Sequence, residues 1–181
     1  MAIQLPQPLR SEIARLAAPW RALPVNVKWV PEQNYHLTLK FLGSITPGEG
    51  QALSKHLQAL ALRSSFLLSV GGWGMFPSIK RPNVFWMGMG GELEALQDLW
   101  RELDDRLSAS GYPRDRHFHP HLTLGRFRSP ANVDSLVARL QQTPALNHVG
   151  TFPVNSLQLM ESKLGPAGPS YRALSSYEFK A

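Results

Sequence analysis

The chain has 181 residues, a formal net charge of +6 and no cysteine. Its length suits one compact domain or two small lobes that share a core. The absence of cysteine excludes disulfides, thiol catalysis and cysteine-ligated zinc, and it agrees with an expected cytoplasmic location. No segment approaches the roughly 20 apolar residues of a membrane span, and the first residues do not resemble a signal peptide. The basic charge favours nucleic acid or acidic ligands as partners, or it simply reflects a solvated basic surface.

The first half of the chain mixes helix and strand patterns. Apolar residues recur at helical spacing over 8–20 and 48–62, which predicts two helices. The apolar run that ends at Pro6 is typical of the tail of a first strand. Further strands are predicted over 26–30, 35–42, 66–70 and 84–89. The Gly- and Pro-rich stretch between the last two, which carries Lys80 and Arg81, is predicted to be a connection.

The second half contains the clearest amphipathic pattern of the chain. Leucines and a tryptophan fall on one face of residues 92–109, which predicts a helix that Gly111 ends. A strand is then predicted over 121–127 and a helix over 133–141. Two closing strands are predicted over 157–160 and 171–179, joined by a proline-rich turn over 165–169.

One tetrapeptide occurs twice: His36-Leu37-Thr38-Leu39 returns as His121-Leu122-Thr123-Leu124. Side chains on a strand alternate between its two faces, so the histidine and threonine of each copy share one face and the leucines share the other. Each strand would therefore present leucines to a core and an imidazole with a hydroxyl outward. The repeat predicts two similar halves whose outward pairs face each other across one cleft.

Two imidazoles and two hydroxyls around one small anion suit phosphoester chemistry. Histidine has a free pKa of about 6.5, so one neutral imidazole can activate a nucleophile while one imidazolium protonates the leaving oxygen. The Thr38 and Thr123 hydroxyls would donate hydrogen bonds to the non-bridging phosphate oxygens, where charge develops. The duplicated motif therefore predicts His36 and His121 as a catalytic acid–base pair.

These motifs and their surroundings resemble a known family. Residues 34–43 and 118–126, which contain the two tetrapeptides, are similar to the RNA 2′,3′-cyclic phosphodiesterases, also called 2′-5′ RNA ligases, of the two-histidine phosphoesterase superfamily. Supporting matches lie at 2–6, 84–86 and 171–174. The resemblance implies a single α+β domain over 1–181, with two antiparallel sheets flanking a central cleft, helices outside and a pseudo-two-fold repeat.

The resemblance also implies a reaction and its residues. It implies hydrolysis of a 2′,3′-cyclic phosphate at an RNA end, or in a cyclic nucleotide, to a 2′-phosphomonoester, with weak ATP-independent 2′-5′ ligation. His36 would protonate the departing 3′ oxygen and His121 would activate water, without metal or organic cofactor, in a monomeric protein. Arg126 would lie near the phosphate. Strict alternation from His121 puts Arg126 on the leucine face, and a bulge or strand end at Gly125 would redirect it.

Three further residues near the first motif and the C-terminus are weaker candidates. Phe41 would stack on a base or pack in the core with the leucines of its strand. Lys40 shares the face of His36 on an ideal strand, so it would attract phosphate or lie exposed. Tyr171 would contact the ligand or pack at the end of its strand.

Two other functions remain open. His117, His119 and His121 alternate, and three histidines on one face can ligate a transition metal, as in a metal-dependent hydrolase or a cupin-like protein. That hypothesis gives no role to His36 or Thr38. The second alternative is a module that binds RNA ends without turnover. Only catalysis requires two histidines in opposite protonation states, so a bell-shaped pH–rate profile would distinguish these functions.

Overall fold

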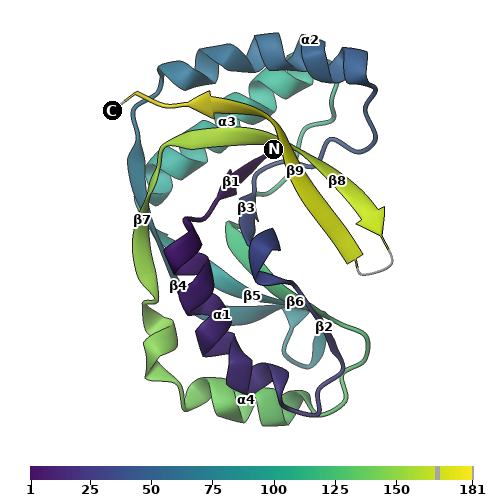
Figure 1. The fold of residues 1–181 in the computed structure, drawn as a ribbon, viewed down its shortest axis with the longest axis vertical. Helices are drawn as coiled ribbons and strands as arrows, with labels where there is room; N and C mark the ends of the chain where they lie inside the picture. The colour runs from purple at the N-terminus through teal and green to yellow at the C-terminus, as the bar shows by residue number, and fades with distance from the viewer. Residues whose placement is uncertain (166–167, 181) are drawn as a thin grey trace.

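The computed structural model describes residues 1–165 and 168–180, and its helices and strands interleave along the chain as an α+β fold. Figure 1 shows their arrangement. In chain order the elements are β1 (Ala2–Gln4), α1 (Gln7–Arg21), β2 (Val27–Trp29), η1 (Glu32–Asn34), β3 (His36–Thr38), α2 (Pro47–Leu57), η2 (Gln58–Leu62), β4 (Phe66–Ser78), β5 (Arg81–Gly91), α3 (Leu93–Ala109), β6 (His121–Phe127), α4 (Val133–Gln141), η3 (Pro144–Asn147), β7 (Gly150–Val154), β8 (Ser156–Gly165) and β9 (Gly168–Glu178).

Within the described residues the strands form one curled sheet of nine strands, so the expectation of two separate sheets is wrong. The order is β7-β4-β5-β6-β3-β1-β8-β9, and β2 pairs with β6 beside β3. Strand β3 connects the two parts of this sheet. It pairs with β1 along one edge and with β6, through Leu37 and Leu122, along the other. Both leucines are completely buried. The core therefore continues across the middle of the sheet, between the two copies of the motif.

The helices cover the outside of this sheet with their apolar stripes. In Figure 1, α2 and α3 lie together at one end of the molecule, and α1 and α4 lie toward the other. The α3 stripe of Leu96, Leu99, Leu103 and Leu107 is fully buried, and Gly111 beyond it has a positive φ of 90°. The helix predictions for 8–20, 92–109 and 133–141 are confirmed. The predicted helix over 48–62 ends at Leu57 and continues as a 3-10 helix.

The Gly-rich stretch after residue 70 is strand and not a connection. β4 and β5 form one long hairpin that runs through it. A Cβ on Gly74 would lie 2.2 Å from the Trp86 ring, and a Cβ on Gly71 would lie 2.3 Å from the Asn147 carbonyl oxygen. These glycines therefore allow neighbouring groups to approach the strand closely. A glycine in this role and a glycine in a turn cannot be distinguished from composition alone.

The predicted strand over 35–42 is much shorter in the structure, because β3 ends at Thr38. The backbone N–H groups of Leu39 and Lys40 both donate to the Met1 carbonyl, at 3.0 and 3.3 Å. Successive N–H groups of a strand point in opposite directions, so this shared acceptor ends the alternation. The side chains after Leu39 therefore do not follow the inside-outside pattern that the sequence predicts.

The C-terminal hairpin is longer than predicted, and one strand was not predicted at all. β8 and β9 pair from Ser156 and Glu178 to Gly165 and Gly168, so both sides of the predicted turn over 165–169 are strand. Residues 166–167 of that turn lie outside the described part of the chain. The unpredicted strand β7 contains a proline and pairs with β4 at the end of the sheet order.

Candidate active site

The two His-x-Thr motifs lie across from each other on neighbouring antiparallel strands, β3 and β6. Their central leucines, Leu37 and Leu122, are direct partners. In an antiparallel pair the residues on either side of such a contact are also opposed, so His36 faces Thr123 and Thr38 faces His121. The leucines occupy the buried face, and the four polar side chains share the other face. Each imidazole therefore lies opposite the hydroxyl of the other motif, on adjacent strands of one sheet.

Both histidines are held by the same backbone interaction. The Nδ1 atom of His36 lies 2.8 Å from the carbonyl oxygen of Asn34, and the Nδ1 atom of His121 lies 2.7 Å from that of His119. A carbonyl can only accept, so Nδ1 carries the hydrogen in both rings. Each imidazole thus presents Nε2 to its surroundings, free to accept a proton when neutral or to donate one when charged.

An aromatic ring packs against each imidazole, and each of the two long hairpins, β4–β5 and β8–β9, supplies one of these rings. Tyr171 of β9 contacts His36 edge to face, with ring centroids 4.7 Å apart. Phe76 of β4 contacts His121 in the same way, at 5.1 Å. Tyr171 was a sequence candidate, whereas Phe76 was missed because its segment was predicted to be a connection. A strand assignment for residues 71–78 would have placed Phe76 in the sheet, where its contact with β6 could be considered.

The two ring environments differ in burial. Burial lowers the pKa of His36 below its ordinary value of 6.5, and the hydrogen bond from Nδ1 to the Asn34 carbonyl opposes this effect only in part. In the free protein His36 therefore favours its neutral form near pH 7. An anion bound between the two rings would reverse this preference, because a nearby negative charge stabilises the imidazolium.

Arg126 lies on the cleft side of β6 because the strand contains a bulge. The pairing of β5 with β6 shifts register between Phe85 and Trp86, whose partners are Gly125 and Thr123, so Leu124 is the extra residue. Leu124 and Gly125 are both buried and Arg126 is exposed. A bulge of this kind reverses the alternation beyond it. The bulge considered from the sequence is therefore present.

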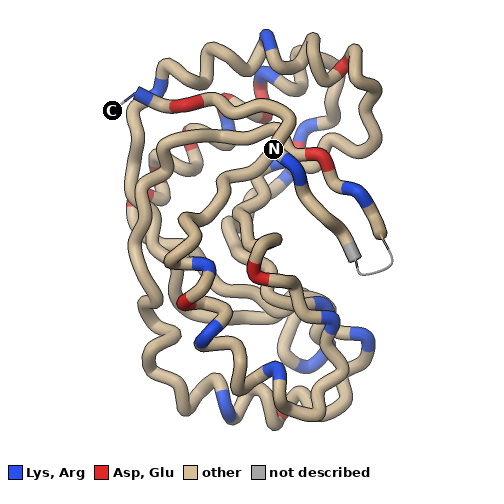
Figure 2. Tube along the Cα trace, viewed as in Figure 1, with Lys and Arg blue, Asp and Glu red and all other residues tan. Residues whose placement is uncertain are grey.

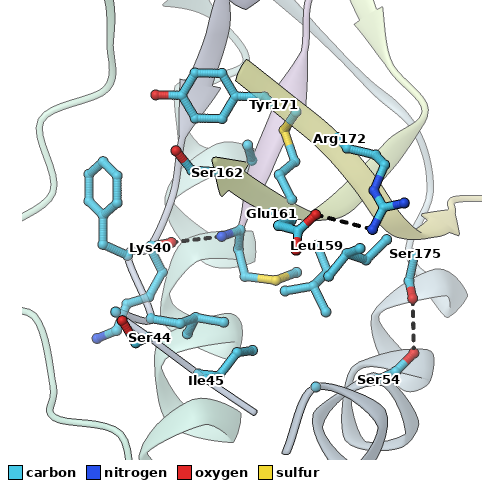
Figure 3. A pocket seen from close by; sticks show the side chains of 18 of the residues that line it. Lys40, Ser44, Ile45, Ser54, Leu159, Glu161, Ser162, Tyr171, Arg172 and Ser175 are labelled. Atoms are coloured by element: carbon cyan, nitrogen blue, oxygen red, sulfur yellow. Dashed lines mark hydrogen bonds and ion pairs between the residues drawn. The ribbon is translucent and has the colours of Figure 1, made fainter. Parts of the chain in front are cut away.

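Both motifs and Arg126 line one cavity of about 670 Å³, together with Tyr171, Phe76 and Phe41. A second cavity of about 840 Å³ lies between β3, α2 and the β8–β9 hairpin (Figure 3). Its wall carries the Glu161–Arg172 ion pair, at 3.1 Å, and several hydroxyls. The cavities share His36, Thr38 and Tyr171 among their lining residues, so the first motif lies where they meet.

Lys40 and Phe41 have exchanged the environments expected from an ideal strand. Phe41 is 76% exposed and lines both cavities, so the core alternative for this residue is wrong. Lys40 is buried, so neither phosphate attraction nor simple exposure describes it. Both results follow from the end of β3 at Thr38.

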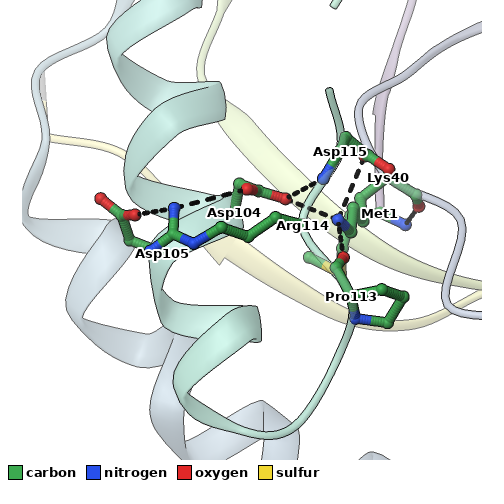
Figure 4. A network of polar contacts seen from close by, with 7 residues as sticks. All are labelled: Met1, Lys40, Asp104, Asp105, Pro113, Arg114 and Asp115. Atoms are coloured by element: carbon green, nitrogen blue, oxygen red, sulfur yellow. Dashed lines mark hydrogen bonds and ion pairs between the residues drawn. The ribbon is translucent and has the colours of Figure 1, made fainter. Parts of the chain in front are cut away.

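The buried Lys40 ammonium group joins β3 to the segment that leads to the second motif (Figure 4). Its Nζ atom lies 2.5 Å from Asp104 of α3, 2.6 Å from the carbonyl oxygen of Pro113 and 3.2 Å from the Asp115 carboxylate. The Asp115 N–H also donates to Asp104, at 3.2 Å. Burial raises the pKa of Asp104, but the bonds from Lys40 and the Asp115 N–H outweigh it and hold that pKa below its ordinary value.

The histidine cluster does not form a metal site among the described residues. No group of three or more His, Asp or Glu side chains there could hold a metal ion. The ring centroids of His117 and His119 are 6.4 Å apart, and His121 Nδ1 is occupied by a backbone carbonyl. The geometry therefore provides no ligand set for the metal-hydrolase alternative. Nor is any described helix long and apolar enough to cross a membrane.

Comparison with known proteins gives consistent matches along the whole chain. A family model for LigT-like phosphoesterases matches residues 3–86 and 91–171. An RNA 2′,3′-cyclic phosphodiesterase of Aeropyrum pernix is 33% identical over 174 residues, which cover 96% of this chain and 93% of that protein. One from Escherichia coli is 34% identical over 134 residues, 72% of each chain. The crystal structure of E. coli LigT complexed with 3′-AMP matches with a TM-score of 0.79 and 26% identity, covering 99% of this chain and 96% of that one.

The curled antiparallel sheet and the opposed His-x-Thr motifs define the class of protein as a phosphoesterase with a LigT-like fold. The matches make the assignment specific. The chain belongs to the LigT-like phosphoesterase family, whose members include the RNA 2′,3′-cyclic phosphodiesterases.

Proposed function

We propose that this protein hydrolyses 2′,3′-cyclic phosphate ends of RNA to 2′-phosphomonoesters, with His36 and His121 as its acid–base pair. One observation carries the proposal: each imidazole uses Nδ1 for a backbone carbonyl and lies opposite the hydroxyl of the other motif. Two free Nε2 atoms therefore face one region that is large enough for a nucleotide. The family's named members support the same substrate class.

In the proposed reaction His121 takes a proton from water, and the resulting hydroxide attacks phosphorus. The bond from phosphorus to O3′ breaks, and His36 gives its proton to that oxygen. The product keeps the phosphate on O2′ and carries a free 3′-hydroxyl. Proton transfer by each histidine contributes roughly 10²–10⁴-fold to the rate. No metal ion is needed for this sequence, because the two imidazoles supply both proton transfers.

The remaining site residues bind the substrate in this proposal. Thr38 and Thr123 donate hydrogen bonds to the non-bridging phosphate oxygens, and Arg126 adds positive charge at the same side of the cleft. Phe41 and Tyr171 offer aromatic faces to the terminal base, and such stacking tolerates any base. A 5′-hydroxyl of a second RNA in place of water would give a 2′-5′ phosphodiester by the same steps, which accounts for a weak ligation activity.

The decisive experiment combines chelation with two histidine variants. EDTA-treated protein is incubated with a short RNA that ends in a 2′,3′-cyclic phosphate, and 2′- and 3′-phosphate products are separated. We expect metal-free conversion to the 2′-phosphate, reduced roughly 10²–10⁴-fold in both His36→Ala and His121→Ala. His148→Ala is the matched control, because His148 is exposed and lies outside both cavities.

Each other outcome points to a different function. Conversion only after a divalent metal is restored would favour a metal-dependent hydrolase. Binding of the cyclic end without turnover, unchanged by pH across the imidazole range, would favour a module that recognises RNA ends. Folded histidine variants with rates near that of the original protein would refute the acid–base assignment.

A further inference from the structure

Two like charges lie directly opposite each other next to the proposed active site. Lys28 of β2 is the register partner of Arg126 of β6. Both side chains are exposed, and both line the 670 Å³ cavity that contains the two His-x-Thr motifs. Opposed like charges on antiparallel strands destabilise the pairing. Their presence at this position therefore needs a reason outside the sheet.

No carboxylate of the described residues lies within ion-pair distance of this pair, and Asp115, which also lines the cavity, is paired with Lys40. Among the described residues, the ion pairs within 4.0 Å include neither Lys28 nor Arg126. Figure 2 shows Lys and Arg gathering around β2 and β6, where Asp and Glu are sparse. An uncompensated cation pair in a cavity is a binding site for an anion.

The close approach of β2 to β6 depends on Gly125. A Cβ at this position would lie 2.4 Å from Val27 Cγ1 and 3.4 Å from the Trp29 ring. The glycine therefore lets β2 pair beside the bulge, and the same bulge turns Arg126 toward the cleft. Gly125 and the adjacent bulge thus bring Lys28 and Arg126 to one face of the sheet.

The position of the pair along β6 indicates which anion it meets. A strand rises about 3.3 Å per residue, and the bulge puts the segment from Thr123 to Arg126 opposite only two steps of β5, so the Arg126 Cα lies roughly 7 Å along β6 from that of Thr123. Lys28 lies across from Arg126 on β2, which pairs with the same strand as β3 does, at positions of β6 beyond the contact of Leu37 with Leu122. An anion held there is separate from the phosphate between the histidines but lies in the same cavity. In an RNA strand the nearest such anion is the phosphodiester on the 5′ side of the terminal nucleotide.

We infer that Lys28 binds the phosphodiester that precedes the cyclic-phosphate nucleotide, while Arg126 beside it faces the terminal phosphate, so the enzyme prefers oligonucleotide ends to cyclic mononucleotides. This inference rests on the proposed function. Lys28 determines the preference for oligonucleotides, because the terminal phosphate is already bound by Thr38 and Thr123. The substrate class is therefore an RNA chain with at least one internal phosphate.

Three substrates distinguish the effect of the internal phosphate charge from the effect of the rest of the ligand. They are adenosine 2′,3′-cyclic phosphate, the dinucleotide ApA ending in a 2′,3′-cyclic phosphate, and the same dinucleotide with an uncharged methylphosphonate linkage. We expect the original protein to show the highest kcat/KM for the charged dinucleotide. Lys28→Gln should lower that value about tenfold, mainly through KM, as the loss of one charge-assisted hydrogen bond predicts.

The effects of Lys28→Gln and of the uncharged linkage on kcat/KM should not be additive. If Lys28 acts on the internal phosphate, Lys28→Gln lowers the ratio of charged to uncharged dinucleotide toward one, and Lys28→Arg restores it. Lys55→Gln is the control for net charge, because Lys55 is exposed on α2 outside both cavities. An equal loss on all three substrates, or no loss on any, overturns the inference. Failure of the proposed function is a separate result, since no substrate would then be hydrolysed.

Discussion

His36 and His121 are equivalent in their backbone interactions but not in their surroundings. Each ring donates Nδ1–H to the carbonyl two residues before it, a contact that comes from the local strand geometry. Burial lowers the pKa of His36, and the Tyr171 ring at 4.7 Å contributes to that burial, whereas the ring beside His121 is that of Phe76. The environments of the two rings can therefore assign different chemical roles to identical motifs.

Tyr171→Ala tests the role of His36 through the pH dependence of kcat/KM. As the proposed acid, His36 is active only when protonated, so the alkaline limb should lie below pH 6.5 in the free enzyme. Removing the Tyr171 ring lets water reach the imidazole, which raises the pKa of His36 and moves that limb to higher pH. Tyr171→Phe keeps the ring and should leave the limb in place. Movement of the acidic limb instead would make His36 the base.

At the scale of elements, the end of β3 decides what its neighbouring side chains do. Because Leu39 and Lys40 share the Met1 carbonyl, Lys40 turns into the core and Phe41 turns into the cavities. The buried ammonium then holds Asp104 of α3 and the Pro113–Asp115 segment. That segment precedes β6, so Lys40 acts as a positioning residue for the second motif.

Lys40→Met should lower the free energy of unfolding by about 3–5 kcal/mol, because it leaves the buried Asp104 carboxylate with only the more distant Arg114, at 3.8 Å, as a charged partner. Lys40→Met combined with Asp104→Leu should recover much of this loss. Lys163→Met is the control, since its ion pair with Glu161 is exposed and worth at most about 1 kcal/mol. Urea denaturation of the four proteins measures the differences. A loss in Lys40→Met no larger than in Lys163→Met would contradict the structural role.

The same network has a pH signature. The pKa of Asp104 in the folded protein lies below its ordinary value of 3.8, so the stabilisation is present above that pH and is lost as pH falls through the folded value. In Lys40→Met, burial without the ammonium raises that pKa, so the acid side of the stability profile should move to higher pH. Identical acid limbs in the two proteins would show that Asp104 does not depend on Lys40.

At the scale of the whole molecule, one sheet and one core connect the two copies of the motif. Among the described residues, β3 and β6 are joined through the register pair of Leu37 with Leu122, and both side chains are fully buried. The cavity that contains both motifs lies on the opposite face of these strands. If residues 1–181 form one domain, we expect folding of the core and assembly of the proposed site to be coupled.

Leu122→Ala should lower the free energy of unfolding by about 2–5 kcal/mol, the usual cost of a cavity at a buried leucine. If residues 1–181 form one domain, circular dichroism and tryptophan fluorescence should still report a single coincident transition. Leu164→Ala is the matched control, because Leu164 is 87% exposed. Two separate transitions in Leu122→Ala would show that the halves unfold independently.

The sequence by itself determined the features that depend on local pattern. Period-3.6 and period-2 patterns located α1, α3, α4 and β6, and the repeated tetrapeptide identified the two strands that face each other. The histidines and threonines could be chosen because strand alternation over three residues is dictated by the backbone. The resemblance of residues 34–43 and 118–126 to a known family agrees with the later family match.

Only the tertiary structure decided the features that depend on contacts between distant segments. The Met1 carbonyl, nearly 40 residues away in sequence, ends β3. As a result Lys40 is buried and Phe41 is exposed. Close contact with the Trp86 ring accounts for Gly74, which lies within a strand although its Gly-rich segment was predicted to be a connection, and contact with Val27 accounts for Gly125 at the bulge. Phe76 beside His121 and Lys28 opposite Arg126 depend on strand register. Register is set by long-range packing, which a local pattern does not contain.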